Sequence, residues 1–177
     1  MELEKLRSLS PIKIWYCDGS CSKNPGPGGW GVLQLSKNKL NTAFYHSEPN
    51  TTNNRMELNA LLYATQQASQ DKDFDHWIYT DSNYCVQIIN EWARKWQANG
   101  WTRSKNQHIE NLELVKSLWS FYSQPFFNVS VFWTKGHDGT IGNELADRLA
   151  VNDLTKFYNI LTKNNIQYTK DCIHYID

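Results

Sequence analysis

Hydrophobic and polar residues follow one another in short blocks along the first part of the chain. Residues 12–17, IKIWYC, are β-branched and aromatic and stop at Asp18-Gly19-Ser20, which predicts a strand that runs into a turn. Residues 24–29, NPGPGG, predict a loop. Two β-prone segments, 30–35 and 42–47, are joined by a polar connection and predict an antiparallel hairpin.

Helical periodicity dominates the rest of the chain. Apolar residues recur at helical spacing over 56–68, after a cluster of Thr and Asn residues that can cap a helix. The same reasoning predicts helices over 82–98, 109–122 and 142–153 and strands over 76–80 and 128–133. This order of elements is typical of an α/β fold in which helices pack on a mixed sheet.

Two acidic residues follow strands that can be neighbours in this sheet. The helix over 56–68 can form a right-handed crossover, so the strands before and after it can lie parallel and side by side. Asp18 ends the first of them and Asp81 ends the second. Ligands of α/β sheets bind outside the carboxyl ends of parallel strands, which makes both acids candidate site residues.

Composition narrows the class of protein. The 177 residues, of which 40% are hydrophobic, suffice for one domain with a buried core and exclude a disordered or collagen-like chain. The 18 basic and 18 acidic residues balance, so a nucleic-acid contact has to be local. We expect a monomeric, cytoplasmic protein without membrane association or disulfides. The expected organisation is a flexible leader (1–11), one domain (12–153) and a C-terminal extension of unassigned role (154–177), for which packing on the domain is the simplest hypothesis.

Each candidate acid also has a purely structural explanation. Asp18 could be a turn residue, Asp81 a helix N-cap, and Glu57 the partner of an Asn54 cap. Asp147 fits such an explanation less well, because it lies in the middle of a predicted helix. Acids gathered at one sheet edge raise one another's pKa unless a cation neutralises them. Mg²⁺ accepts carboxylate and water ligands, and two such ions can support phosphodiester cleavage.

Four segments of the chain resemble type 1 ribonuclease H. They are DGSCSKNPGPGGWG from Asp18, TTNNRMEL from Thr51, YTDSNY from Tyr79 and TKGHDGTIGNELADRLA from Thr134, and the match runs from about residue 12 to 153. The resemblance implies the ribonuclease H-like α/β fold, a five-stranded mixed sheet with strand order 3-2-1-4-5 and flanking helices. It also implies an endoribonuclease that hydrolyses the RNA strand of RNA/DNA hybrids by two-metal-ion catalysis, leaving 3′-hydroxyl and 5′-phosphate ends.

The same resemblance assigns roles to particular residues. Asp18, Glu57, Asp81 and Asp147 resemble the carboxylates that bind two Mg²⁺ ions, for which Mn²⁺ is a substitute. His137 resembles the residue that aids proton transfer or product departure, although a surface imidazole without a role is the alternative. Glu144 matches a further acidic position near the active centre, and an ordinary surface ion pair with Arg148 is its alternative.

Two regions resemble the family's substrate contacts. The residues that resemble its minor-groove and phosphate contacts are Cys21, Asn24, Thr52, Asn53 and Asn54, and the two last ones can equally cap the first helix. Residues 92–105, WARKWQANGWTRSK, hold four cations and no acid, and resemble the family's basic protrusion. Arg94, Lys95, Trp96 and Trp101 are its predicted DNA-strand contacts. The alternative is that Trp92 and Trp96, at i and i+4, are core residues; we expect Trp92 to pack inward.

Two other function classes fit some of these features. An integrase or transposase also gathers acids, but in such an enzyme the Glu comes last rather than second. A module that binds hybrids without cleaving them would be expected to lack one of the metal-binding acids, and this chain retains all four.

Overall fold

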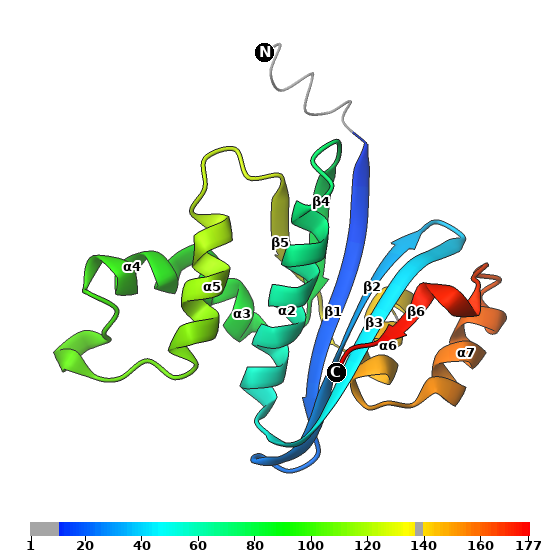
Figure 1. Cartoon of the computed structure of the whole chain (residues 1–177), viewed down its shortest axis with the longest axis horizontal. Coiled ribbons are helices and arrows are strands. Elements are labelled where there is room, and N and C mark those ends of the chain that lie inside the picture. The colour runs from blue at the N-terminus through cyan, green and yellow to red at the C-terminus, as the bar shows by residue number, and fades with distance from the viewer. Residues whose placement is uncertain (1–10, 137–139) are drawn as a thin grey trace.

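The computed structural model describes residues 11–136 and 140–177, and its centre is a six-stranded mixed sheet with helices on both faces (Figure 1). The strands are β1 (Ile12–Cys21), β2 (Gly26–Ser36), β3 (Lys39–Thr51), β4 (Asp75–Thr80), β5 (Val129–Trp133) and β6 (Ile173–Tyr175). The helices are α2 (Asn53–Ser69), α3 (Asn83–Gln87), α4 (Ala93–Ala98), α5 (Leu112–Tyr122), α6 (Ile141–Ala150) and α7 (Leu154–Lys163). The leader, residues 1–10, lies outside the described residues.

The strand order β5-β4-β1-β2-β3-β6 places β1 near the middle of the sheet. β1 pairs in parallel with β4 and antiparallel with β2, and β2 forms the predicted antiparallel hairpin with β3. The order 3-2-1-4-5 predicted for the first five strands is therefore confirmed. The sixth strand was not predicted: β6 comes from the C-terminal extension and pairs in parallel with the outer edge of β3.

Two predicted boundaries are wrong in the same corner of the sheet. β1 does not turn at Asp18, because Gly19 and Ser20 continue its ladder with β2 as far as Cys21. Part of the predicted loop over 24–29 is also strand, since β2 begins at Gly26 opposite Thr51. The backbone hydrogen bonds of the paired strand outweigh the turn preference of the individual residues.

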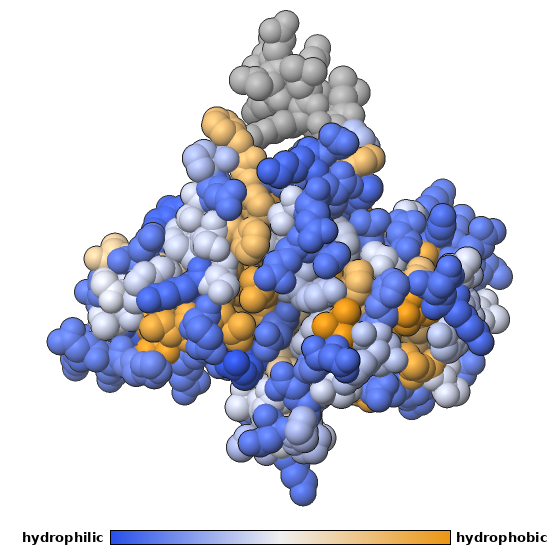
Figure 2. Space-filling view, viewed as in Figure 1, coloured by the Kyte–Doolittle hydropathy of each residue, from blue (hydrophilic) through white to orange (hydrophobic). Residues whose placement is uncertain are grey.

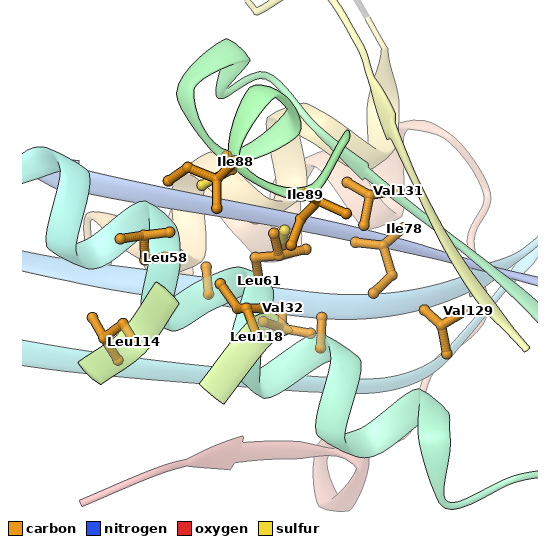
Figure 3. Packing of buried hydrophobic residues seen from close by; sticks show 14 of the residues in the cluster. Val32, Leu58, Leu61, Ile78, Ile88, Ile89, Leu114, Leu118, Val129 and Val131 are labelled. Carbon is orange, nitrogen blue, oxygen red and sulfur yellow. The ribbon is translucent and has the colours of Figure 1, made fainter. Parts of the chain in front are cut away.

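Hydrophobic side chains fill both faces of the sheet. On one face, residues of the sheet such as Val32 and Ile78 meet Leu58 and Leu61 of α2 and Leu118 of α5 (Figure 3). On the other face, α6 and α7 pack through a second cluster that includes Leu33, Leu145, Leu149, Phe157 and Leu161. Alternation along β1 serves both clusters, because Trp15 and Cys17 belong to the first and Tyr16 packs against the second.

The remaining predictions differ from the structure in detail. The helix predicted over 82–98 is α3, a π-helical turn (Ile88–Trp92) and α4 in succession, and the C-terminal extension packs on the sheet as α7 and β6. The face seen in Figure 2 is mainly hydrophilic, with hydrophobic patches between polar residues. Among the described helices, none has the length and apolar character that crossing a membrane requires.

Candidate active site

Asp18 lies in the middle of the sheet and is only 5% exposed. It belongs to β1, opposite Gly31 of β2, so its position is set by a strand that is paired on both sides. The turn explanation for this residue is therefore wrong. The backbone at this position is rigid, so the carboxylate is held in a defined place. Metal binding and catalysis both require such a fixed position.

Glu57 reaches the same place from α2, whose side-chain cap is Thr52. The Thr52 hydroxyl accepts a hydrogen bond from the backbone N–H of Arg55 at 3.2 Å, so Glu57 is not needed for capping. The Glu57 Oε2 atom instead accepts a hydrogen bond from the backbone N–H of Gly19 at 3.1 Å. Gly19 permits this approach, because a Cβ at that position would lie 2.3 Å from the backbone nitrogen of Glu57.

Asp81 follows the carboxyl end of β4 and is half-buried. Ser82 rather than Asp81 caps α3, since its hydroxyl accepts from the backbone N–H of Cys85 at 3.2 Å. The Asp81 backbone is held from β5, where the Trp133 Nε1 donates to its carbonyl oxygen at 3.2 Å. The Asp81 carboxylate is thus free of the capping role that the sequence left open.

The three carboxylates converge on one point. One oxygen from each of Asp18, Glu57 and Asp81 lies within 4.8 Å of the other two. Burial and the negative charges of the neighbouring carboxylates raise the pKa of Asp18 well above its usual range. Burial and the charge of Asp81 raise the pKa of Glu57 from 4.5 to about 8. Without a cation, Asp18 and Glu57 therefore favour their protonated forms at neutral pH.

Asp147 approaches the cluster from α6 but does not join its tightest part. Its charge contributes to the raised pKa of Asp18, while its own Oδ2 accepts a hydrogen bond from Arg148. Helix α6 comes this close to β1 because residue 142 is glycine: a Cβ there would lie 2.2 Å from the Tyr16 ring. The fold thus brings three predicted ligands together and places the fourth beside them.

Arg148 also settles the surface pair considered for Glu144. The Arg148 guanidinium pairs with Asp147 and lies 3.8 Å from Asp153, and no ion pair with Glu144 forms among residues 11–136 and 140–177. Glu144 is half-buried one turn before Arg148. His137 lies outside the described residues.

The predicted minor-groove residues form a single group beside the carboxylates. The strand pair Gly26–Thr51 brings the loop after β1 next to the start of α2, where the Asn24 Oδ1 accepts from the backbone N–H of Asn53 at 3.1 Å. The Cys21 Sγ lies 3.5 Å from the carbonyl oxygen of Thr51. Asn53 and Asn54 are exposed helical residues rather than caps, so their side chains are available for contacts.

The basic segment over 92–105 lines part of an aromatic pocket, which Glu110 also lines. Trp92 and Trp96, whose ring centroids are 5.7 Å apart, line a pocket of about 450 Å³ together with Tyr84 and Arg103. Both tryptophans are half-buried, so Trp92 packs inward only in part, and Trp101 lies beneath the ammonium group of Lys116. Arg94 and Lys95 are exposed, with Lys95 in a solvent-exposed pair with Glu91.

The structure adds site residues that sequence reasoning did not select. Gly136 packs against the carboxylate of Asp81, since a Cβ there would lie 2.8 Å from its Oδ2. Arg148 was considered only as a partner of Glu144, but it holds Asp147. The Gly136 contact has no signal in the sequence, because it depends on how separate elements pack. Asp147 and Arg148 are neighbours in the chain, but the sequence does not say which of the nearby acids Arg148 pairs with.

Comparison with known proteins identifies the family. The family model described as RNase H matches residues 11–155. A protein named Ribonuclease H from Orientia tsutsugamushi (strain Boryong) is 43% identical over 155 residues, which is 88% of each chain.

Solved structures agree with this assignment. LC9-RNase H1, described as a type 1 RNase H with the type 2 active-site motif, is 28% identical with a TM-score of 0.68 and covers 90% of this chain and 87% of its own. LC11-RNase H1, solved in complex with an RNA/DNA hybrid, shares the fold with 21% identity and a TM-score of 0.58, over 81% of this chain and 97% of its own. With more than two thirds of its length matched by both the family model and a close relative, the chain belongs to the RNase H family of nucleases.

Proposed function

We propose that this enzyme is an endonuclease that hydrolyses the RNA strand of RNA/DNA hybrids and leaves 3′-hydroxyl and 5′-phosphate ends. The observation that carries the proposal is the convergence of Asp18, Glu57 and Asp81 from three separate elements, with ligand oxygens within 4.8 Å of one another. Protein interiors rarely gather buried acids without a compensating cation or a catalytic use, because like charges at this distance repel.

The chemistry of these donors fits two divalent ions. Carboxylate oxygens are ligands for hard cations, and Mg²⁺ takes a few of them while it keeps waters and phosphate oxygens; Mn²⁺ is the expected substitute. Asp18, Glu57, Asp81 and Asp147 would hold the ions. When bound, the ions lower the pKa of an attacking water and stabilise the leaving oxygen in phosphodiester cleavage.

The chain's own residues fix the orientation of these ligands. The Gly19 N–H holds the Glu57 carboxylate. Pairing with Gly31 of β2 holds the Asp18 backbone, and the residue before it, Cys17, is also paired with β4. The link from Trp133 to the Asp81 carbonyl fixes the end of β4. Groups supported in this way keep their geometry when substrate enters, so little reorganisation is needed for the reaction. We assign His137 to proton transfer or product departure, a role for which an imidazole is chemically suited.

We expect the residues around the carboxylates to select an RNA/DNA hybrid as the substrate. Recognition of RNA requires contacts to the 2′-hydroxyl, for which Cys21, Asn24, Asn53 and Asn54 offer small polar groups and backbone beside the cluster. Thr52 with Asn24 would hold a phosphate of the DNA strand. The DNA strand would also contact the exposed cations Arg94 and Lys95, which bind phosphates, and the tryptophans Trp96 and Trp101, which pack against sugars. Such contacts do not read the base sequence. That the enzyme is monomeric and cytoplasmic stays a prediction.

Cleavage of labelled hybrid, duplex DNA and duplex RNA with Mg²⁺ tests this proposal. We expect cleavage of the RNA strand of the hybrid alone, and loss of most of it in Asp81→Asn. Without metal, the melting temperature of this variant should be no lower than that of the wild type, because the variant removes one of the charges that repel one another. Asp73→Asn is the matched control, because Asp73 is an exposed acid outside the cluster. Binding of hybrid without cleavage by the wild type, or cleavage of duplex DNA instead, would refute the assignment.

A further inference from the structure

Three neighbouring parallel strands end in one row at the edge of the sheet that holds the carboxylates. Cys17 of β1 lies opposite Thr80 of β4, and Thr80 lies opposite Trp133, the last residue of β5. Asp18 follows Cys17 in the chain, and Asp81 follows Thr80. Neighbouring strands are about 4.8 Å apart, so Trp133 lies about 10 Å from the backbone of β1, at the carboxyl ends where α/β sheets bind ligands.

Trp133 lies on the face of the sheet that α2 covers, but its side chain remains exposed. Val129 and Val131, which share this side of β5, point into the core cluster together with Ile78 (Figure 3). Trp133 is 52% exposed, and it is the only exposed one of the eight tryptophans, all of which the structure describes. Because α2 also carries Glu57, the exposed ring and that carboxylate are on the same side of the sheet.

Contacts with Asp81 and its neighbour hold the end of β5 in place. The Trp133 Nε1 donates to the Asp81 carbonyl oxygen at 3.2 Å, and Gly136 packs against the Asp81 carboxylate. The backbone N–H of Thr134 donates to the carbonyl oxygen of Thr80 at 2.8 Å, so the strand pairing extends to the residue before Asp81. An aromatic ring that is already held in this way loses little conformational entropy when a ligand packs against it.

The exposed indole can bind one particular part of a hybrid. A ring whose N–H is hydrogen-bonded to the protein presents an apolar surface to its ligand. In a duplex the base faces are stacked on one another, whereas the sugars are accessible along the wide, shallow minor groove. In the proposed function the DNA strand contacts the basic segment and Thr52 with Asn24, and the RNA strand passes the carboxylates. The sugar nearest to Trp133 is therefore a ribose.

We propose that the Trp133 indole packs against a ribose of the RNA strand next to the cleaved linkage and so positions that strand over the carboxylates. The contact adds affinity for the substrate without adding charge and without reading the base sequence. A single exposed aromatic residue needs no function by itself; here the row of strand ends and the hydrogen bond to Asp81 place it beside the reacting strand. This inference rests on the proposed function.

Trp133→Phe and Trp133→Leu separate the aromatic ring from its hydrogen bond. Both variants lose the indole N–H, so a fall in kcat that is common to both reports the lost support of Asp81. Only Trp133→Leu also loses the ring, and its KM for hybrid should be about 3- to 10-fold higher than that of Trp133→Phe, because one apolar ring face is no longer removed from water. The salt dependence of hybrid binding should be equal in the two variants, since packing against a sugar releases no counterions.

Phe126→Leu is the matched control, because Phe126 is 93% exposed and precedes the opposite end of β5; it should keep the wild-type KM and kcat. Equal KM values in Trp133→Phe and Trp133→Leu, with a wild type that cleaves hybrid, would overturn this inference alone. A wild type that does not cleave hybrid would overturn the proposed function as well.

Fluorescence decides the question if Trp133→Leu does not fold. Saturating hybrid, with EDTA to prevent cleavage, should cover the indole and shift its emission to shorter wavelength. The emission of Trp133 is obtained as the difference between the wild type and Trp133→Phe. A difference spectrum that hybrid leaves unchanged would refute the contact.

Discussion

The raised pKa of Glu57 predicts that the metal-free enzyme loses stability as the pH rises. Glu57 is 6% exposed, and burial together with the charge of Asp81 raises its pKa from 4.5 to about 8. Each pKa unit corresponds to about 1.4 kcal/mol, so this shift is on the order of 5 kcal/mol in the free energy of unfolding. That is a large part of the stability of an ordinary domain, which is about 5 to 15 kcal/mol.

The sign follows from the protons bound in each state. Between pH 4.5 and about 8, folded Glu57 keeps a proton that the unfolded chain releases, so the free energy of unfolding falls as the pH rises through this window. The full stabilisation is present below pH 4.5 and is lost once the pH passes about 8. A divalent cation that binds only the folded carboxylates should restore stability at pH 8, in proportion to the logarithm of its concentration.

Urea unfolding with EDTA, from pH 5 to pH 9, measures this effect. Glu57→Gln keeps an acceptor for the Gly19 N–H and removes the charge, so it should be several kcal/mol more stable than the wild type at pH 8. Its free energy of unfolding should lose the part of the pH dependence that Glu57 contributes, while the raised pKa of Asp18 leaves a smaller fall with pH. Glu110→Gln changes an exposed glutamate and should behave like the wild type. Metal-free wild type that is equally stable at pH 5 and pH 8 would refute the electrostatic account of the cluster.

Two further predictions concern substrate binding and packing. Replacing Arg94, Lys95, Arg103 and Lys105 by Gln should weaken hybrid affinity and flatten its salt dependence, and an unchanged slope in a binding titration would show that these residues do not contact the duplex. Gly19→Ala should destabilise the protein by about 3 kcal/mol or more, because its Cβ would lie 2.3 Å from the Glu57 backbone, whereas Gly100→Ala meets no atom within 4 Å and costs only about 1 to 2 kcal/mol for its positive φ. Equal losses in urea unfolding would contradict this steric argument.

Local patterns in the sequence were sufficient to predict most helices and strands, but they placed the ends of these elements poorly. The periodicity of residues 56–68 correctly predicts α2, because a buried helix face requires that spacing. Asp18-Gly19-Ser20 resembles a turn only when it is considered alone, and pairing with β2 keeps it extended. The C-terminal extension lacks a clear strand pattern, and β6 exists because the edge of β3 offers unpaired backbone groups.

Sequence reasoning proposed the acids of the site, and their structural alternatives could be decided only in three dimensions. Whether Asp81 or Ser82 caps α3, and whether Glu57 serves Asn54 or Gly19, depends on side-chain directions that neighbouring residues in the chain do not fix. The partner of Arg148 is a similar case. Glu144 and Asp147 share its helix and Asp153 follows the end of that helix, so all three acids are near Arg148 in the chain.

By itself, the sequence determined the type and order of the main elements and which acids could act together, because both depend on short-range periodicity and residue chemistry. Only the tertiary structure decided how close those acids come, how far burial raises the pKa of Asp18 and Glu57, and that the C-terminal extension packs on the sheet as α7 and β6. These properties depend on distances between segments far apart in the chain, and such distances are set by packing of the whole sheet and its helices.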